Sequence, residues 1–285
     1  MIEGEPSLTA LHVAAARAAH LRYDASPHLL EDSCAEELLG SLADELLPIY
    51  ADDGPSWLLR ENRLFIPFRA RYAEDRLAIA YRAGVRQLVI LGAGLDSYAF
   101  RRPAGQSALR VFEVDHPSTQ GWKVNRIAEL GWQLPAGLHF VPCDFEQTRP
   151  SQALLDAGFA TDEPAVVTWM GVVYYLEPET VRAALVDLHD MLAPCSEVVF
   201  DYQFPVEDLP AHYREFQRQI ASYLERVGEP QGNRYRAAEL REEILGAGFA
   251  EALMEERDAL VQRYFAPLDS QIPVSERFGI AVARR

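Results

Sequence analysis

Short apolar runs and helical stretches alternate along the chain from residue 86 onward. The apolar runs are nearly continuous, which is typical of strands buried on both faces of a parallel sheet. They predict strands at residues 87–91, 109–114, 138–141, 165–169 and 197–202. Helices are predicted at residues 117–130, from Pro178 onward, after the fifth strand and at residues 237–245. Two further strands, near residues 250–256 and 277–283, have no helix between them, so we expect an antiparallel hairpin at the end of the sheet.

Residues 1–83 have a different pattern, because apolar positions recur there at helical spacing. Ser7 can cap a helix over residues 8–21, and a second helix is predicted over residues 36–50. Pro67 stands where a third helix can begin, since proline is favoured at the first helical position. We therefore expect an α/β protein in which a helical N-terminal cover, residues 1–83, packs on a Rossmann-like domain, residues 84–285, as one compact unit.

The charge of the chain limits its partners. Lys and Arg total 27 and Asp and Glu total 43, so the formal net charge is −16 and the sequence pI is about 4.9. A surface this negative repels phosphate backbones and anionic membranes, which argues against a nucleic-acid-binding or membrane-binding protein. The longest apolar stretch, residues 165–176, is also too short to span a bilayer. We expect a small-molecule partner, and the sequence specifies no oligomeric state.

The three cysteines, Cys34, Cys143 and Cys195, are too few for a disulfide framework and lack zinc-type spacing. The segment before Ser7 has neither the basic nor the apolar region of a secretion signal. These features predict a reduced, cytoplasmic protein without a metal site.

A glycine motif directly follows the first predicted strand. Gly92 and Gly94 in LGAGLDS, residues 91–97, permit a tight turn and a close approach of backbone to a ligand. Glu113 and Asp115 come about twenty residues later at the end of the second strand, where an acid accepts hydrogen bonds from ribose hydroxyls. Ser97 stands where a dinucleotide motif needs its third glycine, which disfavours an NAD enzyme. S-adenosylmethionine has a ribose and an adenine but no pyrophosphate, so it does not need that glycine.

The end of the third strand carries a second nucleoside signal. Asp144 and Phe145 follow this strand, and such a pair suits an adenine pocket. The carboxylate accepts from the exocyclic amine, and the ring packs nearby.

Over nearly its whole length the sequence resembles the leucine carboxyl methyltransferase / TcmP-type O-methyltransferase family, which uses S-adenosylmethionine. The matching segments are SLTA at 7–10, RARYAED at 69–75, VILGAGLD at 89–96, FEVD at 112–115, FVPCD at 140–144, GVVYYL at 171–176, GEP at 228–230 and RYF at 263–265. The resemblance implies a class I methyltransferase fold, a seven-stranded Rossmann-like sheet with a helical N-terminal cover.

The resemblance also implies the residues that bind the cofactor. Its methionine end would lie over Gly92, Ala93 and Gly94, and Arg71 would meet its carboxylate. Asp115 would hold the ribose, with Glu113 as the alternative, and Asp144 and Phe145 would hold the adenine. Arg69 and Arg71 lie about 200° apart around a helix, so only one of them can face the site. A surface ion pair with Glu74 or Asp75 is the other role open to either arginine.

One position departs from the family. Members directed at protein leucine carboxylates carry a glutamate that meets the cofactor ammonium, and Met170 stands there in this chain. The ammonium would then be met by backbone carbonyls or by Asp96. This departure favours a branch that acts on small molecules.

The expected activity is methyl transfer to a small molecule, with a carboxylate as the preferred acceptor. A carboxylate is ionised at neutral pH and needs no general base, whereas a phenol or alcohol needs one. Tyr174, Tyr175 and His116 are the candidate catalytic residues, although core packing of the tyrosines and helix capping by His116 are also open. Because the net charge repels anions, a local cation such as Arg17 or Arg22 would have to hold the acceptor, unless these arginines only form a solvated helix face. A phenol or alcohol O-methyltransferase and a non-catalytic S-adenosylmethionine-binding protein are the alternatives.

Overall fold

A seven-stranded sheet forms the centre of the protein in a computed structural model that describes residues 6–54, 57–145, 147–226, 228–268 and 270–285. The segment before Ser7 that bears on a secretion signal lies mostly outside these residues. The strands are β1 Gln87–Leu91, β2 Arg110–Asp115, β3 Leu138–Pro142, β4 Ala165–Trp169, β5 Glu197–Gln203, β6 Glu251–Met254 and β7 Phe278–Arg284. Their order is β3-β2-β1-β4-β5-β7-β6, and β7 runs antiparallel to both of its neighbours, β5 and β6, whereas the other neighbouring pairs are parallel. The predicted α/β fold and the antiparallel pairing of the last two strands are confirmed. The expectation that no helix separates these strands is wrong, because a short helix, Arg257–Leu260, and a turn, Val261–Phe265, lie between β6 and β7.

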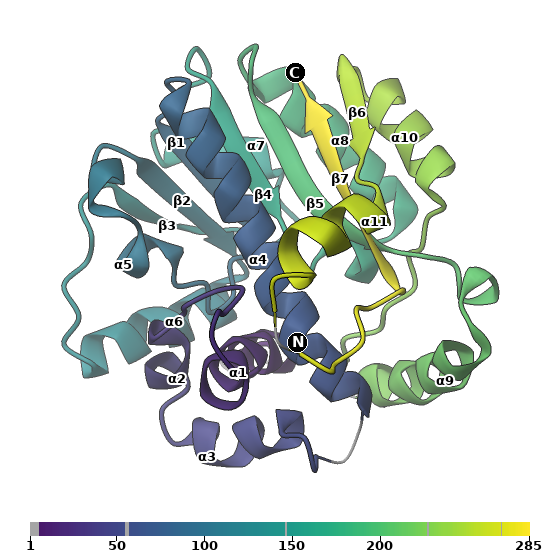
Figure 1. The fold of residues 1–285 in the computed structure, drawn as a ribbon. Coiled ribbons are helices and arrows are strands. Elements are labelled where there is room, and N and C mark those ends of the chain that lie inside the picture. The colour runs from purple at the N-terminus through teal and green to yellow at the C-terminus, as the bar shows by residue number, and fades with distance from the viewer. Residues whose placement is uncertain (1–5, 55–56, 146, 227, 269) are drawn as a thin grey trace.

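Helices cover both faces of this sheet (Figure 1). Every residue of β1, β4 and β5 is buried, as the continuous apolar runs predict. One core joins α1 to α4 with one face of the sheet, and a second joins α7, α8 and α10 with the other. The helices are α1 Leu8–Tyr23, α2 Cys34–Leu39, α3 Leu42–Leu46, α4 Trp57–Arg82, α5 Tyr98–Arg101, α6 Pro117–Glu129, α7 Pro150–Asp156, α8 Pro178–Met191, α9 Ala211–Arg226, α10 Ala237–Gly246 and α11 Arg257–Leu260.

Single turns complete the secondary structure. The 3₁₀ turns are η1 Leu47–Tyr50, η2 Ala104–Gln106, η3 Val173–Tyr175 and η4 Val206–Asp208, and η5 Val261–Phe265 is one wider, π-type turn. Among the described residues, no helix combines the length and the apolar composition that a bilayer-spanning segment needs.

Two predictions for the N-terminal helices are wrong. The helix expected over residues 36–50 is divided into α2, α3 and η1, because Gly40 ends α2 with a positive φ of 59°. Pro67 does not begin a helix but lies inside α4, a helix of 26 residues. Proline at this position removes one helical hydrogen bond, to the Arg63 carbonyl, and burial of Leu64, Phe68 and Leu77 against the sheet stabilises the helix despite that loss.

The cover lies at the edge of the sheet where the parallel strands end. Figure 1 shows α1, α2 and α3 below that edge, with α4 running from them across the front of the sheet. Ser7 caps α1 as predicted, since its hydroxyl accepts from the Ala10 N–H at 3.2 Å. The Ser7 N–H donates to Thr119 Oγ1 of α6 at 3.0 Å, and Arg126 of α6 donates to the Glu37 carbonyl of α2. The cover is therefore joined directly to the strand ends that carry the predicted site.

Candidate functional site

The loop after β1 brings backbone N–H groups to the carboxyl edge of the sheet. Gly92 and Gly94 have φ values of 66° and 52°, a region that side chains with a Cβ rarely adopt. A Cβ on Gly92 would collide with Val172, and one on Gly94 would lie 3.1 Å from the Ala10 Cβ of α1. The cover helix therefore packs directly over Gly94, and a side chain at either glycine would be strained and would meet other protein atoms.

The two acids of β2 have different surroundings. Asp115 lies at the strand end, half-buried, and accepts from the backbone N–H of Gly94 and, at 2.6 Å, from that of His116. Burial raises the Asp115 pKa, while these two N–H groups oppose the rise. Glu113 is fully buried and paired with Lys123 of α6, and burial raises its pKa to about 7 despite that pairing. Asp115 is thus the acid at the site, and Glu113 belongs to the core.

Asp144 and Phe145 lie together at the end of β3, both half-buried. The Asp144 carboxylate accepts from Gln147 Nε2 at 2.7 Å, and its carbonyl accepts from the Thr148 N–H at 2.8 Å. Phe145 lines a cavity of about 520 Å³ that extends over the apolar side chains of Leu91, Trp169 and Leu176. The indole Nε1 of Trp169 is buried without a hydrogen-bond partner. Phe145 therefore borders a cavity, and adenine binding by Asp144 and Phe145 stays a prediction.

A second, smaller cavity of about 80 Å³ lies on the α4 side of the same strand ends. It is lined by Gly92 and Ala93 of the glycine loop, by Met170 after β4 and by four charged residues, which are Arg17, Arg69, Glu74 and Asp96. Two cationic and two anionic side chains therefore line this cavity. Three of them already form ion pairs, Arg17 with Asp32, Arg69 with Asp201 and Glu74 with Arg101.

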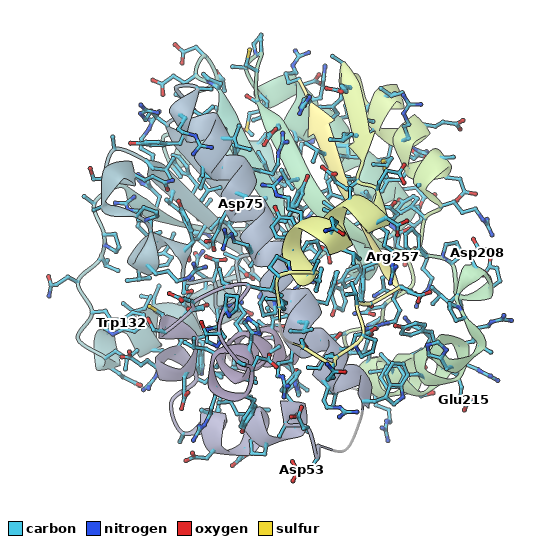
Figure 2. All side chains as sticks on the ribbon, in the orientation of Figure 1. Asp53, Asp75, Trp132, Asp208, Glu215 and Arg257 are labelled. Carbon is cyan, nitrogen blue, oxygen red and sulfur yellow. The ribbon has the colours of Figure 1, made fainter. Side chains whose placement is uncertain are left out.

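Arg69 and Arg71 lie in different surroundings, and Arg69, not Arg71, is the arginine beside the small cavity. Arg69 is 5% exposed, lines the small cavity, and donates from Nη1 to Tyr174 Oη at 2.9 Å and to Asp201 Oδ2 at 3.0 Å. Arg71 does not line that cavity and pairs with Asp75 at 2.9 Å, part-way along α4 (Figure 2). The structure therefore places Arg71 in the ion pair that was its alternative role, and Arg69 at the site.

The two arginines of α1 also differ. Arg22 is exposed and pairs with Glu36, as a solvated helix face requires. Arg17 is 5% exposed, binds Asp32 at 2.7 Å and donates to the Leu95 carbonyl at 2.6 Å. Ser97, at the position of the missing third glycine, donates to the same Asp32 carboxylate at 2.7 Å. Ser97 thus helps to attach the cover to the glycine loop.

The three candidate catalytic side chains are all engaged in the structure. His116 accepts from the Ser118 N–H through Nδ1 and caps α6, so the capping role is the one observed. Tyr174 accepts from Arg69, and Tyr175 accepts from Gln231 Nε2 at 2.7 Å. Burial raises the pKa of Tyr174 and raises that of Tyr175 to about 12, so neither phenol is a base near neutral pH.

Two residues of the small cavity, Arg69 and Glu74, were not predicted to contact a ligand. Glu74 pairs with Arg101, and burial raises its pKa. The sequence pattern that could have indicated both residues is the apolar stripe of Ile66, Ala70, Ala73 and Leu77. It has helical spacing, lines the cavity, and gives the face of the helix on which Arg69 and Glu74 lie. Among the residues that the structure describes, no group of three or more His, Cys, Asp or Glu side chains could hold a metal ion.

Comparison with known families gives one match, over residues 10–189, to the family described as leucine carboxyl methyltransferase. A Bacillus subtilis protein provisionally named S-adenosyl-L-methionine-dependent methyltransferase YktD is 42% identical over 134 residues, which are 47% of this chain and 44% of that protein. A Mycolicibacterium smegmatis protein with the same provisional description is 35% identical over 156 residues, 55% of this chain and 49% of its own length. The chain thus spans about half the length of the curated relatives it matches.

Solved structures agree with the fold. A provisionally assigned methyltransferase of Thermobifida fusca superimposes with a TM-score of 0.56 at 17% identity, over 99% of this chain and 96% of that one. A DUF574 family protein of Streptomyces avermitilis gives 0.54 at 15% identity, over 95% and 97% of the two chains. At such low identity these matches show the fold alone.

Proposed function

Because the chain belongs to the leucine carboxyl methyltransferase family, we propose that it is an S-adenosylmethionine-dependent methyltransferase that esterifies a carboxylate of a small molecule. The observation that carries this proposal is the small cavity at the end of β1, lined by Arg17, Arg69, Glu74 and Asp96. A methionine end bears one carboxylate and one ammonium, so two arginines and two acids are complementary to it. The names of the relatives support the same cofactor.

The residues present fit the whole cofactor. Arg69 and Arg17 would hold its carboxylate, and Asp96 and Glu74 its ammonium, in place of the family glutamate at Met170. The tight turn at Gly92 and Gly94 would bring backbone close to the cofactor, and Asp115 would accept from the ribose. Asp144 would accept from the adenine amine, with Phe145 beside the ring. The unpartnered Trp169 Nε1 in the apolar wall supplies one further donor. When bound, the cofactor supplies an electrophilic methyl group on a sulfonium.

The protein then has to position the acceptor and exclude water. A carboxylate acceptor is already ionised, so no side chain has to remove a proton. This suits a site in which His116 caps a helix and both tyrosines are engaged. The cover helix α1 closes the glycine loop from solvent, since Ala10 packs on Gly94 and Val13 lines the cavity. A dry, preorganised site favours methyl transfer because it removes the hydration shell of the nucleophile.

The product distinguishes the acceptor classes. We expect calorimetric binding of S-adenosylhomocysteine, and a methylated product that mild base hydrolyses, as a methyl ester requires. Replacing Gly94 with Val should abolish binding in a protein that retains its circular dichroism spectrum, and replacing Gly105, which is exposed and has open space around it, should not. A base-resistant product, with a rate that rises with pH through one ionisation, would instead identify a phenol or alcohol acceptor.

A further inference from the structure

A second group of charged residues lies beyond the small cavity, on the side of β5 and β7. It consists of Glu61 from α4, Gln217 from α9, Arg234 from the segment before α10 and Arg277 directly before β7, and we call it the arginine cluster. Arg277 is 4% exposed, lies 3.4 Å from Glu61 Oε2 through Nε, and donates to Asn62 Oδ1 at 2.7 Å. Arg234 donates to Gln203 and, at 3.5 Å, to Gln217 Oε1.

The cluster is incompletely paired. In the described part of the chain three buried side-chain atoms of this cluster, Glu61 Oε2, Arg277 Nε and Gln217 Nε2, have no close hydrogen bond. The first two face each other in the 3.4 Å ion pair, so the amide Nε2 of Gln217 is the donor left without a partner. Gln217 is 3% exposed, so its amide N–H groups have no access to solvent as a substitute. An unpaired buried donor destabilises a folded protein, so its presence calls for a ligand or a functional reason.

The cluster also has an excess of positive charge. Two arginines face one glutamate, and among the described residues Arg234 has no carboxylate within ion-pair distance. Burial lowers the pKa of Arg277, which Glu61 only partly opposes, and burial together with Arg277 lowers the pKa of Arg234. One excess positive charge remains, inside a protein whose net charge is −16.

The cluster is close to the proposed methyl-transfer site. Arg69, which lines the small cavity, donates to Tyr174 Oη, and the Tyr174 ring lies 6.0 Å from the ring of Phe278. The Arg277 guanidinium lies over that same Phe278 ring, 4.6 Å from its centroid. The Gly232 N–H donates to the Tyr174 carbonyl at 3.1 Å, which fixes the Arg234 segment beside η3. Tyr174 therefore stands between the cavity and the cluster.

We propose that Arg234, Arg277 and Gln217 bind a second carboxylate of the acceptor, so that the substrate is a dicarboxylic acid of which one group is esterified. This inference rests on the proposed function. One excess positive charge and the unpaired amide N–H of Gln217 match a carboxylate, whereas a phosphate monoester would bring a second negative charge that the cluster does not balance. The bound carboxylate is the one that does not react, because it lies beyond Tyr174 and two guanidinium groups reduce its nucleophilicity. Arg234, the partly exposed member, forms the outer side of the subsite.

The test compares acids that differ only in the second carboxylate. Succinate, glutarate, adipate and benzene-1,3-dicarboxylate are each assayed against the matching monoamide, with S-adenosylhomocysteine release as the readout. We expect the dicarboxylate to have a kcat/KM about tenfold or more above that of its monoamide. Arg234→Gln should remove this preference by raising the KM of the dicarboxylate toward that of its monoamide. Gln217→Glu, which puts a negative charge in the subsite, should remove it as well.

Arg218→Gln is the matched control, because Arg218 is exposed on α9 and pairs with Glu215. The substitution changes the net charge of the protein by the same amount as Arg234→Gln. It should leave the preference unchanged. A wild-type protein without the preference, or variants that retain it, would overturn the subsite. Calorimetric titration of each dicarboxylate into the protein with bound S-adenosylhomocysteine decides the matter without turnover, since binding to none of them also overturns it. If the protein does not bind S-adenosylhomocysteine, the proposed function is contradicted instead. The subsite would still be supported in that case if the wild type binds a dicarboxylate and Arg234→Gln does not.

Discussion

At the scale of single residues, the two acids of β2 should give opposite phenotypes. Asp115→Ala removes the acceptor at the strand end and should weaken S-adenosylhomocysteine binding by about 1.5–3 kcal/mol, with little change in stability. Glu113→Gln leaves Lys123 buried without a counter-ion and should lower the free energy of unfolding by about 3–5 kcal/mol, without a specific loss of binding. Calorimetry and denaturant unfolding on both variants check this. Loss of binding in Glu113→Gln alone would mean that the ribose partner is Glu113.

Arg69 and Arg71 form a similar pair on α4. Arg69→Lys keeps the charge beside Asp201 but loses the planar fork, and we expect about a tenfold or greater loss of S-adenosylhomocysteine affinity. Arg71→Lys is the matched control, since Arg71 only pairs with Asp75 and a carbonyl outside the cavity, and it should bind as the wild type does. The opposite ranking would restore Arg71 as the carboxylate ligand.

Site residues at the ends of strands could be predicted from the sequence better than site residues on a helix. Gly92, Gly94 and Asp115 follow from their place directly after strands, because the end of a parallel strand is a defined position. Choosing between Arg69 and Arg71 requires the rotational phase of α4, and a helix that begins at Pro67 does not give the phase of one that begins at Trp57. Glu113 shares a strand face with Asp115, and only the packing of Lys123 against it shows that it is core.

At the scale of elements, the attachment of α1 should control activity more than stability. Both Glu229 carboxylate oxygens accept from the first turn of α1, from the Leu8 N–H at 3.1 Å and the Thr9 N–H at 3.0 Å. Glu229→Gln removes the charge and one acceptor, and should cost about 0.5–2 kcal/mol locally. We expect faster hydrogen exchange in the first turn of α1 and a lower kcat/KM, with a small change in Tm.

Glu225→Gln, an exposed acid at the end of α9, is the control and should change neither quantity. An unchanged exchange rate in Glu229→Gln would show that the contact does not hold the cover in place. Removing residues 1–22 is a less selective test of the cover, because α1 buries Leu11, five alanines and the Arg17–Asp32 ion pair, so that the deletion would also remove core.

Elements with a repeating pattern were predictable, and those set by tertiary contacts were not. All seven strands lie within two residues of the predicted bounds, because burial on both faces leaves a continuous apolar run. The break at Gly40 and the passage of α4 through Pro67 depend on what packs against them: Gly40 lies against Arg126 of α6, and α4 is held by the sheet. Local propensity carries no information on such contacts.

At the scale of the whole molecule, the net charge should act with opposite sign on the two substrates. A charge of −16 repels a carboxylate acceptor at long range and attracts S-adenosylmethionine, whose sulfonium and ammonium outweigh its carboxylate. Added salt screens both effects, since the Debye length falls from about 30 Å at 0.01 M to about 10 Å at 0.1 M. Across that range we expect kcat/KM for the acid to rise and the affinity for S-adenosylmethionine to fall.

S-adenosylhomocysteine, which has no sulfonium charge, is the internal control, and its affinity should stay nearly constant. The buried contacts of Arg69 and Arg277 should be little affected, because screening acts mainly on exposed and distant charges. The salt dependence therefore separates the long-range field from the local sites. If kcat/KM for the acid and the affinities for S-adenosylmethionine and S-adenosylhomocysteine all changed alike with salt, a general effect of salt on the protein would explain the result. The prediction of an anionic acceptor that the net charge repels and local cations bind would then be contradicted.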